Sequence, residues 1–326
     1  MASQLEWQYL KNSFMTFEYL NELGSKREPF LFICDFKAEK LQVVLLKDLQ
    51  NADIEFCIDE NYEKKEHEHT LKKTPKSFAE YKKKFDFVIE KIKSGDTYLL
   101  NLTQPTKIDI NLTLKQIYKN ANAHYKLRYK DEFVCFSPEK FIQLKGDKIH
   151  TYPMKGTIDA SLPHAEQSIL ANEKEMAEHI MVVDLLRNDL SIVAKNVRVE
   201  KFRYVQTIEA GEKKLLQVSS HISGYVGESW HVEIGTILKS LLPAGSISGA
   251  PKKSTLEIID EVEGYDRGYF SGVFGVYDGI TLDSGVMIRF IQKSENTYIY
   301  KSGGGITLDS DANLEYNELQ DKIYLP

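Results

Sequence analysis

FIQLKGDKIHTY, residues 141–152, carries the clearest structural signal in the chain. Two short strand-like runs flank Gly146-Asp147, a pair typical of a tight hairpin turn. Strands joined by such a turn run antiparallel. The segment therefore predicts a β-hairpin and, with it, an antiparallel sheet.

Other strand-like and helical segments surround this hairpin in clusters. The strand-like segments are FLFICDF (30–36), LQVVLL (41–46), TYLLNLTQ (97–104), EFVCFS (132–137), VRVEKFRYVQTI (197–208), KKLLQVSSHISGYV (213–226), FGVYD (274–278) and VMIRFI (286–291). The spacing of apolar residues predicts a helix from Phe78 to a stop at Ser94-Gly95, and others over 164–188, 230–242, 252–262 and 312–324. Because strands and helices do not alternate strictly, the pattern favours an α+β fold with mostly antiparallel sheets over a doubly wound parallel fold.

The composition is that of a soluble globular protein. The chain has 326 residues, of which 42% are hydrophobic and 28% charged, and its formal net charge is −6. This mild acidity, without a concentrated basic region, disfavours binding to nucleic acid. The longest apolar runs, 30–34 and 41–46, are far shorter than the ~20 residues of a membrane span, and the first residues lack the pattern of a secretory signal.

The cysteines Cys34, Cys57 and Cys135 are scattered and lack C-x-x-C spacing. This spacing excludes a disulfide scaffold and a cysteine-based zinc site. It favours small buried thiols in a reducing compartment, so we expect a cytoplasmic protein.

A charged segment separates two parts of the chain. Residues 59–77 are poor in apolar side chains, which predicts a linker or surface excursion, with His67 and His69 on a solvated surface. We divide the chain into a short N-terminal segment, residues 1–75, that contributes to the sheets, and a main domain, residues 76–326.

Several segments of the second part carry chemistry. In LLPAGSISGAPKK (241–253), small residues before a helix leave backbone N–H groups exposed as an anion site, although a simple tight turn is an equal alternative. The spacing is not that of a phosphate loop, which disfavours nucleotide binding. In KSGGGITLDSD (301–311), consecutive glycines weaken a strand unless something approaches the backbone closely. Glu315 and Glu318 lie one turn apart on the last predicted helix and alone indicate a solvated face.

Further polar residues follow strands or precede apolar runs. The segments are SPEKF (137–141), with Glu139; YPMKGT (152–157), with Lys155; and AEHIMVVDLLRND (177–189), with Glu178. Strand alternation places His221 on the face opposite Ser220, where a half-buried histidine with satisfied hydrogen bonds is the default.

In this order and spacing, the segments resemble the chorismate-utilising enzymes. This family includes anthranilate synthase component I, aminodeoxychorismate synthase component I, and isochorismate and salicylate synthases. The matching segments are SPEKF, YPMKGT, AEHIMVVDLLRND, GSISGAPK, RGYFSG, MIRF and SGGGITLDSDANLEYNELQDK, which together span roughly residues 90–326. The resemblance implies a chorismate-binding catalytic domain whose two antiparallel sheets pack as a sandwich, with helices on the outside.

The resemblance also implies a Mg²⁺ ion held by glutamates of two helices. Here these are Glu178 and Glu318, with Glu315 as a nearby ligand, direct or through water. Mg²⁺ prefers one or two carboxylates together with waters and substrate oxygens, so the ring carboxylate of chorismate would complete its shell.

The remaining site residues are carried over one by one. Arg289 matches the arginine that grips the enolpyruvyl carboxylate, suitably through a bidentate fork. His221 would contact the region of the C4 hydroxyl, and Glu139 matches the acid that protonates this group as it departs. The other substrate oxygens would be bound by Thr157, Ser246, Gly304, Gly305 and Lys322. Phe270 stands where the family usually has tyrosine, which removes one hydroxyl from the carboxylate clamp.

Two positions separate the reactions within the family. Members that add water at C2 use a lysine where this chain has Leu99, and members that add an amine usually have glutamine there. Leucine cannot act as a base, which disfavours isochorismate and salicylate synthesis. Lys155 is the mark of aminodeoxychorismate synthase component I, whereas anthranilate synthases resemble PIAGT at this segment.

The implied reaction is two displacements that yield 4-amino-4-deoxychorismate for the folate and 4-aminobenzoate pathway. The amine of Lys155 attacks C2 while Glu139 assists loss of the C4 hydroxyl, and ammonia then attacks C4 and expels the lysine. Because none of the cysteines resembles a nucleophile, we expect ammonia from a separate glutamine amidotransferase subunit or from free ammonium. We expect a separate aminodeoxychorismate lyase downstream, and no nucleic-acid or membrane partner. Anthranilate synthase component I and a non-catalytic chorismate-binding relic are the alternatives.

Overall fold

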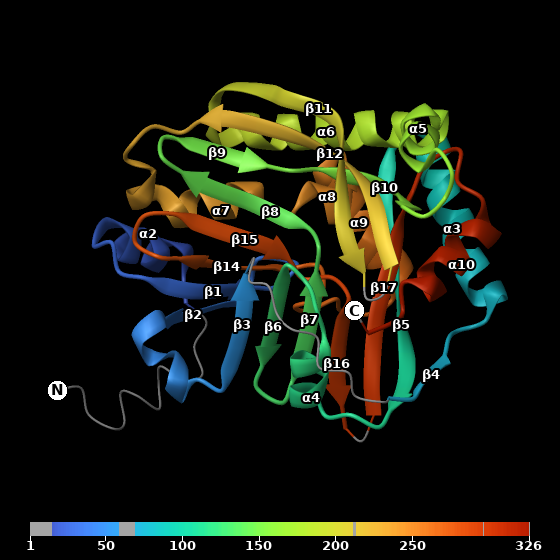
Figure 1. Ribbon diagram of the computed structural model, residues 1–326, viewed down its shortest axis with the longest axis horizontal. Coiled ribbons are helices and arrows are strands. Elements are labelled where there is room, and N and C mark those ends of the chain that lie inside the picture. Colours follow the sequence, from blue (N-terminus) through green and yellow to red (C-terminus); the bar gives the residue numbers. More distant parts are fainter. Residues whose placement is uncertain (1–14, 59–68, 211–212, 296, 326) are drawn as a thin grey trace.

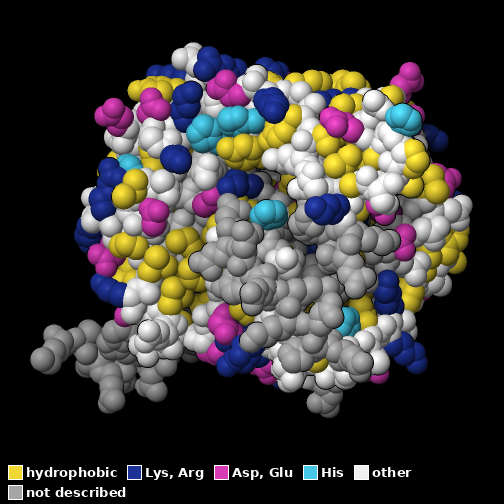
Figure 2. All heavy atoms as spheres, viewed as in Figure 1, with side chains coloured by type: hydrophobic (Ala, Val, Ile, Leu, Met, Phe, Trp, Pro, Cys, Tyr) yellow, Lys and Arg dark blue, Asp and Glu magenta, His cyan; other side chains and the backbone are white. Residues whose placement is uncertain are grey.

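A computed structural model describes residues 15–58, 69–210, 213–295 and 297–325. Its strand pairs are all antiparallel and form two sheets (Figure 1). None of the helices in these ranges is both long and apolar enough to cross a membrane. Figure 2 shows acidic and basic side chains interspersed over the described part of one face.

The first sheet contains the predicted hairpin. Its strand order is β10 (Met154–Asp159), β12 (Lys213–Tyr225), β9 (Lys148–Thr151), β8 (Lys140–Lys145), β15 (Leu282–Val286), β14 (Val273–Tyr277), β1 (Phe30–Cys34) and β2 (Leu41–Leu45), and β11 (Lys195–Ala210) pairs with β12. Lys145 pairs with Lys148, so β8 and β9 turn at Gly146-Asp147 as the sequence predicts. The hairpin prediction is confirmed.

The second sheet is built mainly from other parts of the chain. Its order is β13 (Gly249–Ala250), β5 (Leu99–Ile110), β17 (Thr297–Ile306), β16 (Phe290–Ser294), β7 (Phe133–Ser137), β6 (Tyr125–Tyr129) and β3 (Ile54–Ile58), and β4 (Leu71–Thr74) pairs with β5. β1 and β2 thus lie in one sheet and β3 and β4 in the other. The division of the chain at residues 75 and 76 stays a prediction.

The burial of β1 shows how the layers stack. Leu31 and Ile33 pack against the second sheet, in one apolar cluster with Leu127 of β6. Phe30 and Phe32, on the opposite face of β1, belong to the cluster that contains most of the helices. These are α2 (Phe17–Ser25), α3 (Phe78–Lys93), α6 (Glu173–Val193), α7 (Ile234–Leu241), α9 (Lys252–Glu263) and α10 (Ala312–Asp321). The predicted sandwich with helices outside is confirmed.

Shorter helices complete the chain. They are α4 (Leu114–Asn120), α5 (Ala165–Ala171), α8 (Gly245–Ser248) and the 3₁₀ helices η1 (Leu46–Asn51) and η2 (Trp230–Glu233). α4 covers the outer face of the second sheet, packing with β5, β7 and β17. Because η2 forms the first turn of the helix predicted over 230–242, the regular part of that helix begins only at Ile234.

Two predicted elements are divided in the structure. The helix predicted over 164–188 breaks at Asn172, whose backbone is extended and whose side chain accepts a hydrogen bond from the Glu175 N–H. Asparagine favours this N-cap geometry, so α5 ends and α6 begins there. The strand predicted over 286–291 also breaks, because β15 ends at Val286 in the first sheet and β16 begins at Phe290 in the second. The intervening residues carry the chain from sheet to sheet, and Arg289 has a φ of 52°.

The charged segment 59–77 is only partly a surface excursion. Leu71–Thr74 forms the edge strand β4 against β5, with Lys72 and Lys73 exposed. Lysines on an edge strand disfavour pairing with another chain. His69 is exposed, as predicted, whereas His67 lies outside the described residues.

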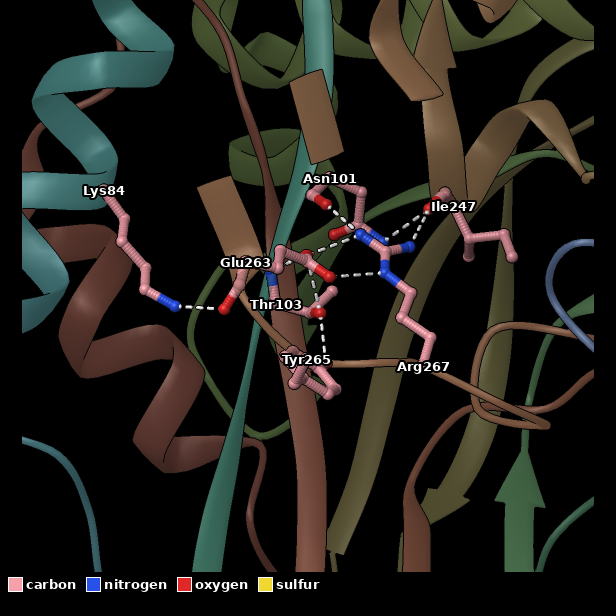
Figure 3. Close-up of polar contacts among 7 residues, drawn as sticks. All are labelled: Lys84, Asn101, Thr103, Ile247, Glu263, Tyr265 and Arg267. Atoms are coloured by element: carbon pink, nitrogen blue, oxygen red, sulfur yellow. Dashed lines mark hydrogen bonds and ion pairs between the residues drawn. The ribbon is translucent and has the colours of Figure 1, made fainter. Parts of the chain in front are cut away.

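A buried ion pair joins the end of α9 to both neighbouring layers (Figure 3). Arg267 binds Glu263 through two hydrogen bonds of 2.7 and 2.8 Å, and each side chain is only 1% exposed. Arg267 also donates to the carbonyls of Asn101 and Ile247, at 2.6 and 3.0 Å. On the other side, the backbone N–H and hydroxyl of Thr103 donate to Glu263. The pair therefore fixes β5 and α8 relative to α9.

Candidate active site

A cavity of about 260 Å³ lies where strands of both sheets meet α6, α8 and α10. It brings together most of the predicted site residues. Those that line it are Glu139, Lys155, Thr157, Ser246, Phe270, Arg289, Gly304, Gly305, Glu318 and Lys322. His221, Glu178 and Glu315 do not line it, although the two glutamates lie close to residues that do.

Lys155 reaches the cavity from β10. The pairing of β10 with β12 shifts register between Met154 and Thr157, and such an irregularity re-aims side chains. The Lys155 Nζ lies 3.3 Å from Glu178 Oε2 on α6. It is also 3.8 Å from the point that a Cβ of Gly305 would occupy. The amine therefore lies between the α6 carboxylate and the glycine strand β17.

The glycines of β17 leave room for side chains of α10 and of the segment just after it. A Cβ at Gly304 would lie 3.3 Å from Glu315 Oε2 and 3.8 Å from Lys322 Nζ. Lys322 donates to the Gly303 carbonyl at 3.0 Å and pairs with Glu318 at 2.7 Å. The consecutive glycines thus mark a close approach to the backbone.

Carboxylates of α6 and α10 gather beside the cavity. Burial raises the pKa of Glu175, and the neighbouring charge of Glu178 raises it further. Burial also raises the pKa of Glu315, and the charges of Glu318 and Glu178 add to that effect. These glutamates repel one another, so a bound cation would stabilise them.

The carboxylate oxygens of these glutamates are suitable ligands for Mg²⁺. Carboxylate oxygens are its preferred protein ligands, and it often takes only one or two of them. Within the described ranges, no group of three or more His, Cys, Asp and Glu side chains could hold a metal ion by itself. A site formed by Glu178 and Glu318, with Glu315 nearby, would need substrate oxygens or waters to complete it.

Glu139 is placed to act as an acid. It follows β7, lines the cavity and accepts a hydrogen bond of 2.5 Å from the Ser246 hydroxyl of α8. Burial raises its pKa, against the opposing effects of Ser246, Lys155 and Lys322. A carboxyl group with a raised pKa keeps its proton closer to neutral pH and can donate it.

Arg289 lies on the segment that passes from one sheet to the other. Its guanidinium contacts the Tyr324 hydroxyl and sits 4.7 Å from the centre of that ring. Burial lowers its pKa, yet an arginine stays cationic at neutral pH. The cavity therefore has a fixed positive charge for an anionic ligand.

His221 lies elsewhere on the first sheet. Its ring stacks on Tyr152, with centroids 4.7 Å apart, and its Nε2 is 3.0 Å from Nδ1 of His150. Its predicted contact with substrate gains no support from this position.

Phe270 lines the cavity, with its ring 5.9 Å from that of Phe290.

Sequence reasoning missed several residues of the site. Asn101, Gln217 and Lys301 line the cavity, and Glu175 belongs to the carboxylate group. Glu175 stands one helical turn before Glu178, which would have revealed it. Gln217 shares a strand face with His221, which does not line the cavity, so alternation alone does not place Gln217 in the site.

A cavity lined by two carboxylates, several cations and a glycine backbone suits a small anionic ligand. Residues 12–325 match the family of chorismate binding enzymes, and the chain belongs to this family. An uncharacterized PabA-like protein of Haemophilus influenzae is 47% identical over 313 residues, which cover 95% of each chain.

Relatives with named activities are more distant. Aminodeoxychorismate synthase component 1 of Klebsiella aerogenes is 33% identical over 262 residues, 76% of this chain and 57% of that protein. The structure of anthranilate synthase component I from Streptococcus pneumoniae is similar with a TM-score of 0.65 and 25% identity, covering 78% of this chain and 58% of that one. The chain is thus a chorismate-utilising enzyme related to both synthases.

Proposed function

We propose that the protein is an aminodeoxychorismate synthase component I, which replaces the C4 hydroxyl of chorismate with an amino group. The observation that carries this proposal is the amine of Lys155 at the cavity, between Glu178 and the glycine strand. A primary amine at this place can serve as a nucleophile toward the bound ring.

The reaction proceeds by two displacements. Lys155 attacks C2, both conjugated double bonds of the ring shift by one position, and the C4–O bond breaks as Glu139 gives its proton to the hydroxyl, which leaves as water. Ammonia then forms a bond to C4, both double bonds shift back, the C2–N bond to Lys155 breaks, and the new C4 ammonium returns a proton to Glu139. The lysine retains its nitrogen, and chorismate plus ammonia become 4-amino-4-deoxychorismate plus water.

Other groups hold the substrate in place. Arg289 would bind one carboxylate, and the backbone of Gly304 and Gly305 with Lys322 would bind further oxygens. Glu178 and Glu318, with Glu315, would hold Mg²⁺, which supplies positive charge to the ring carboxylate when bound. Ammonia would come from a glutamine amidotransferase subunit, and a separate lyase would convert the product to 4-aminobenzoate.

One assay tests this function. Purified protein is incubated with chorismate, MgCl₂ and ammonium chloride, and the products are separated by chromatography and identified by mass. We expect 4-amino-4-deoxychorismate, and its formation should stop when EDTA removes the metal. Anthranilate as the product would contradict the proposal in favour of an anthranilate synthase, and chorismate binding without any product would indicate a relic.

Replacing Glu139 with glutamine should lower kcat about a hundredfold, because general-acid assistance to the departing hydroxyl is lost. The wild type should lose activity as pH rises through the raised pKa of Glu139, since the ionised form has no proton to give. Ser246→Ala removes a hydrogen bond that favours the ionised form, so this loss should move to higher pH. Profiles of kcat between pH 5.5 and 9 measure both effects. A Glu139→Gln variant with the wild-type rate and profile would exclude Glu139 as the acid.

A further inference from the structure

One buried polar atom of a residue that lines the cavity lacks a partner among the described residues. The side-chain oxygen Oε1 of Gln217, on β12, is buried and accepts no hydrogen bond from any described group. Among the buried side-chain atoms of the described cavity lining, it alone is unpaired. A buried amide oxygen without a donor is unfavourable, so the cavity is incomplete without a ligand that carries an N–H or O–H group.

The rest of the lining is rich in donors and cations. Lys155, Arg289, Lys301 and Lys322 all contribute to it. Of the two carboxylates in the lining, Glu139 accepts from Ser246 and Glu318 pairs with Lys322. Carboxylates of a substrate need donors and would find them in these cations. The Oε1 atom of Gln217 is, in contrast to these cations, a neutral acceptor without a donor.

A neutral acceptor suits ammonia. Ammonia has three N–H bonds to donate and must stay uncharged to attack carbon, whereas a carboxylate would favour its protonated, non-nucleophilic form. On the basis of the proposed amination, we infer that Gln217 Oε1 binds the attacking ammonia and positions it for the second displacement.

The surroundings of Gln217 agree with this role. Gln217 pairs directly with Thr157 of β10, the strand that carries Lys155. Beside Gly305, where the Lys155 amine lies, the nearest neighbour is the apolar Cδ1 of Leu99, which offers no acceptor. Gln217 on β12 supplies a neutral acceptor on the strand next to that of Lys155.

The test is steady-state kinetics of the purified chain with ammonium chloride, chorismate and MgCl₂. Gln217→Met keeps the size of the side chain and removes the acceptor. It should raise KM for ammonium about tenfold, the effect of one lost hydrogen bond, while KM for chorismate stays within about twofold. Gln217→Glu keeps an acceptor, so its KM for ammonium should not rise, but kcat should fall because the carboxylate holds ammonium in its charged form.

The neighbouring strand provides a matched control. Gln206 of β11 pairs with Gln217 across the sheet, accepts from Ser219 at 2.9 Å and does not line the cavity. Gln206→Met should leave both KM values unchanged. Chorismate affinity, measured by calorimetry, shows that each variant is folded.

The outcomes separate this inference from the proposed function. An unchanged KM for ammonium in Gln217→Met, in a chain that makes 4-amino-4-deoxychorismate, overturns the inference alone. A rise in KM for chorismate instead also overturns it, because the amide would then hold the substrate hydroxyl. A wild type that makes no aminated product overturns the proposed function, and the inference with it.

Discussion

Replacing Lys155 with alanine is expected to lower kcat for chorismate amination about a thousandfold or more, which is ~4 kcal/mol of activation free energy. The reason is that the variant lacks the nitrogen that opens the first displacement. Chorismate affinity should change little, since Arg289 and the β17 backbone still line the cavity. Single-turnover kinetics and calorimetry measure the two quantities separately.

Lys174 gives the matched control for this variant. Its Nζ lies 3.8 Å from Glu178 Oε1, so it neutralises the same carboxylate from outside the cavity. Lys174→Ala should keep nearly the wild-type rate. Without ammonium, intact-mass analysis of the wild type with chorismate should show an adduct of chorismate less one water, absent from Lys155→Ala. Equal turnover in the two lysine variants would remove Lys155 from the mechanism.

Replacing Arg267 with methionine is expected to reduce the free energy of unfolding by about 3–5 kcal/mol. The substitution leaves the Glu263 carboxylate buried without its cation, and among the described residues Thr103 remains to donate to it. It also removes one donor each from the carbonyls of Asn101 and Ile247, which both belong to cavity-lining residues. Urea denaturation of the wild type and the variant gives the difference.

An exposed pair with the same spacing serves as the reference. Lys82 and Asp86 also stand four residues apart, on α3, with half of each side chain exposed. Lys82→Met should cost at most about 0.5 kcal/mol. The double variant Glu263→Met/Arg267→Met should recover part of the loss, because no unpaired charge remains. If Arg267→Met unfolds at the wild-type urea concentration, the buried pair contributes no stability.

The sequence was most informative where local chemistry alone determines structure. The Gly146-Asp147 turn needs only its own residues and two flanking strands, and it was predicted to the residue. The segment 286–291 shows the limit of such reasoning. All of its residues except Arg289 are apolar, and the local pattern does not say that Val286 belongs to one sheet and Phe290 to the other. That assignment depends on partners far away in the chain.

The candidate site, too, was only partly predictable from local sequence. Glu139, Lys155 and Arg289 were predictable because they lie in segments specific to the family, and all three line the cavity. Gln217 and Lys301 lie outside such signatures, in strands whose polar residues read as ordinary solvent-facing positions. Only the pairing of β12 with β10, and of β17 with β5, brings them to the cavity.

The position of β17 near the end of the chain leaves β5 without its main partner during synthesis. β17 joins β5 to β16 in the middle of the second sheet, yet it is the last strand to be synthesised. Residues 99–110 therefore emerge long before the partner that pairs with most of their length. During that interval the nascent chain exposes an open strand edge, which chaperones or other unfinished chains can bind. Slow translation of the final third should accordingly increase aggregation, even when the finished protein is stable.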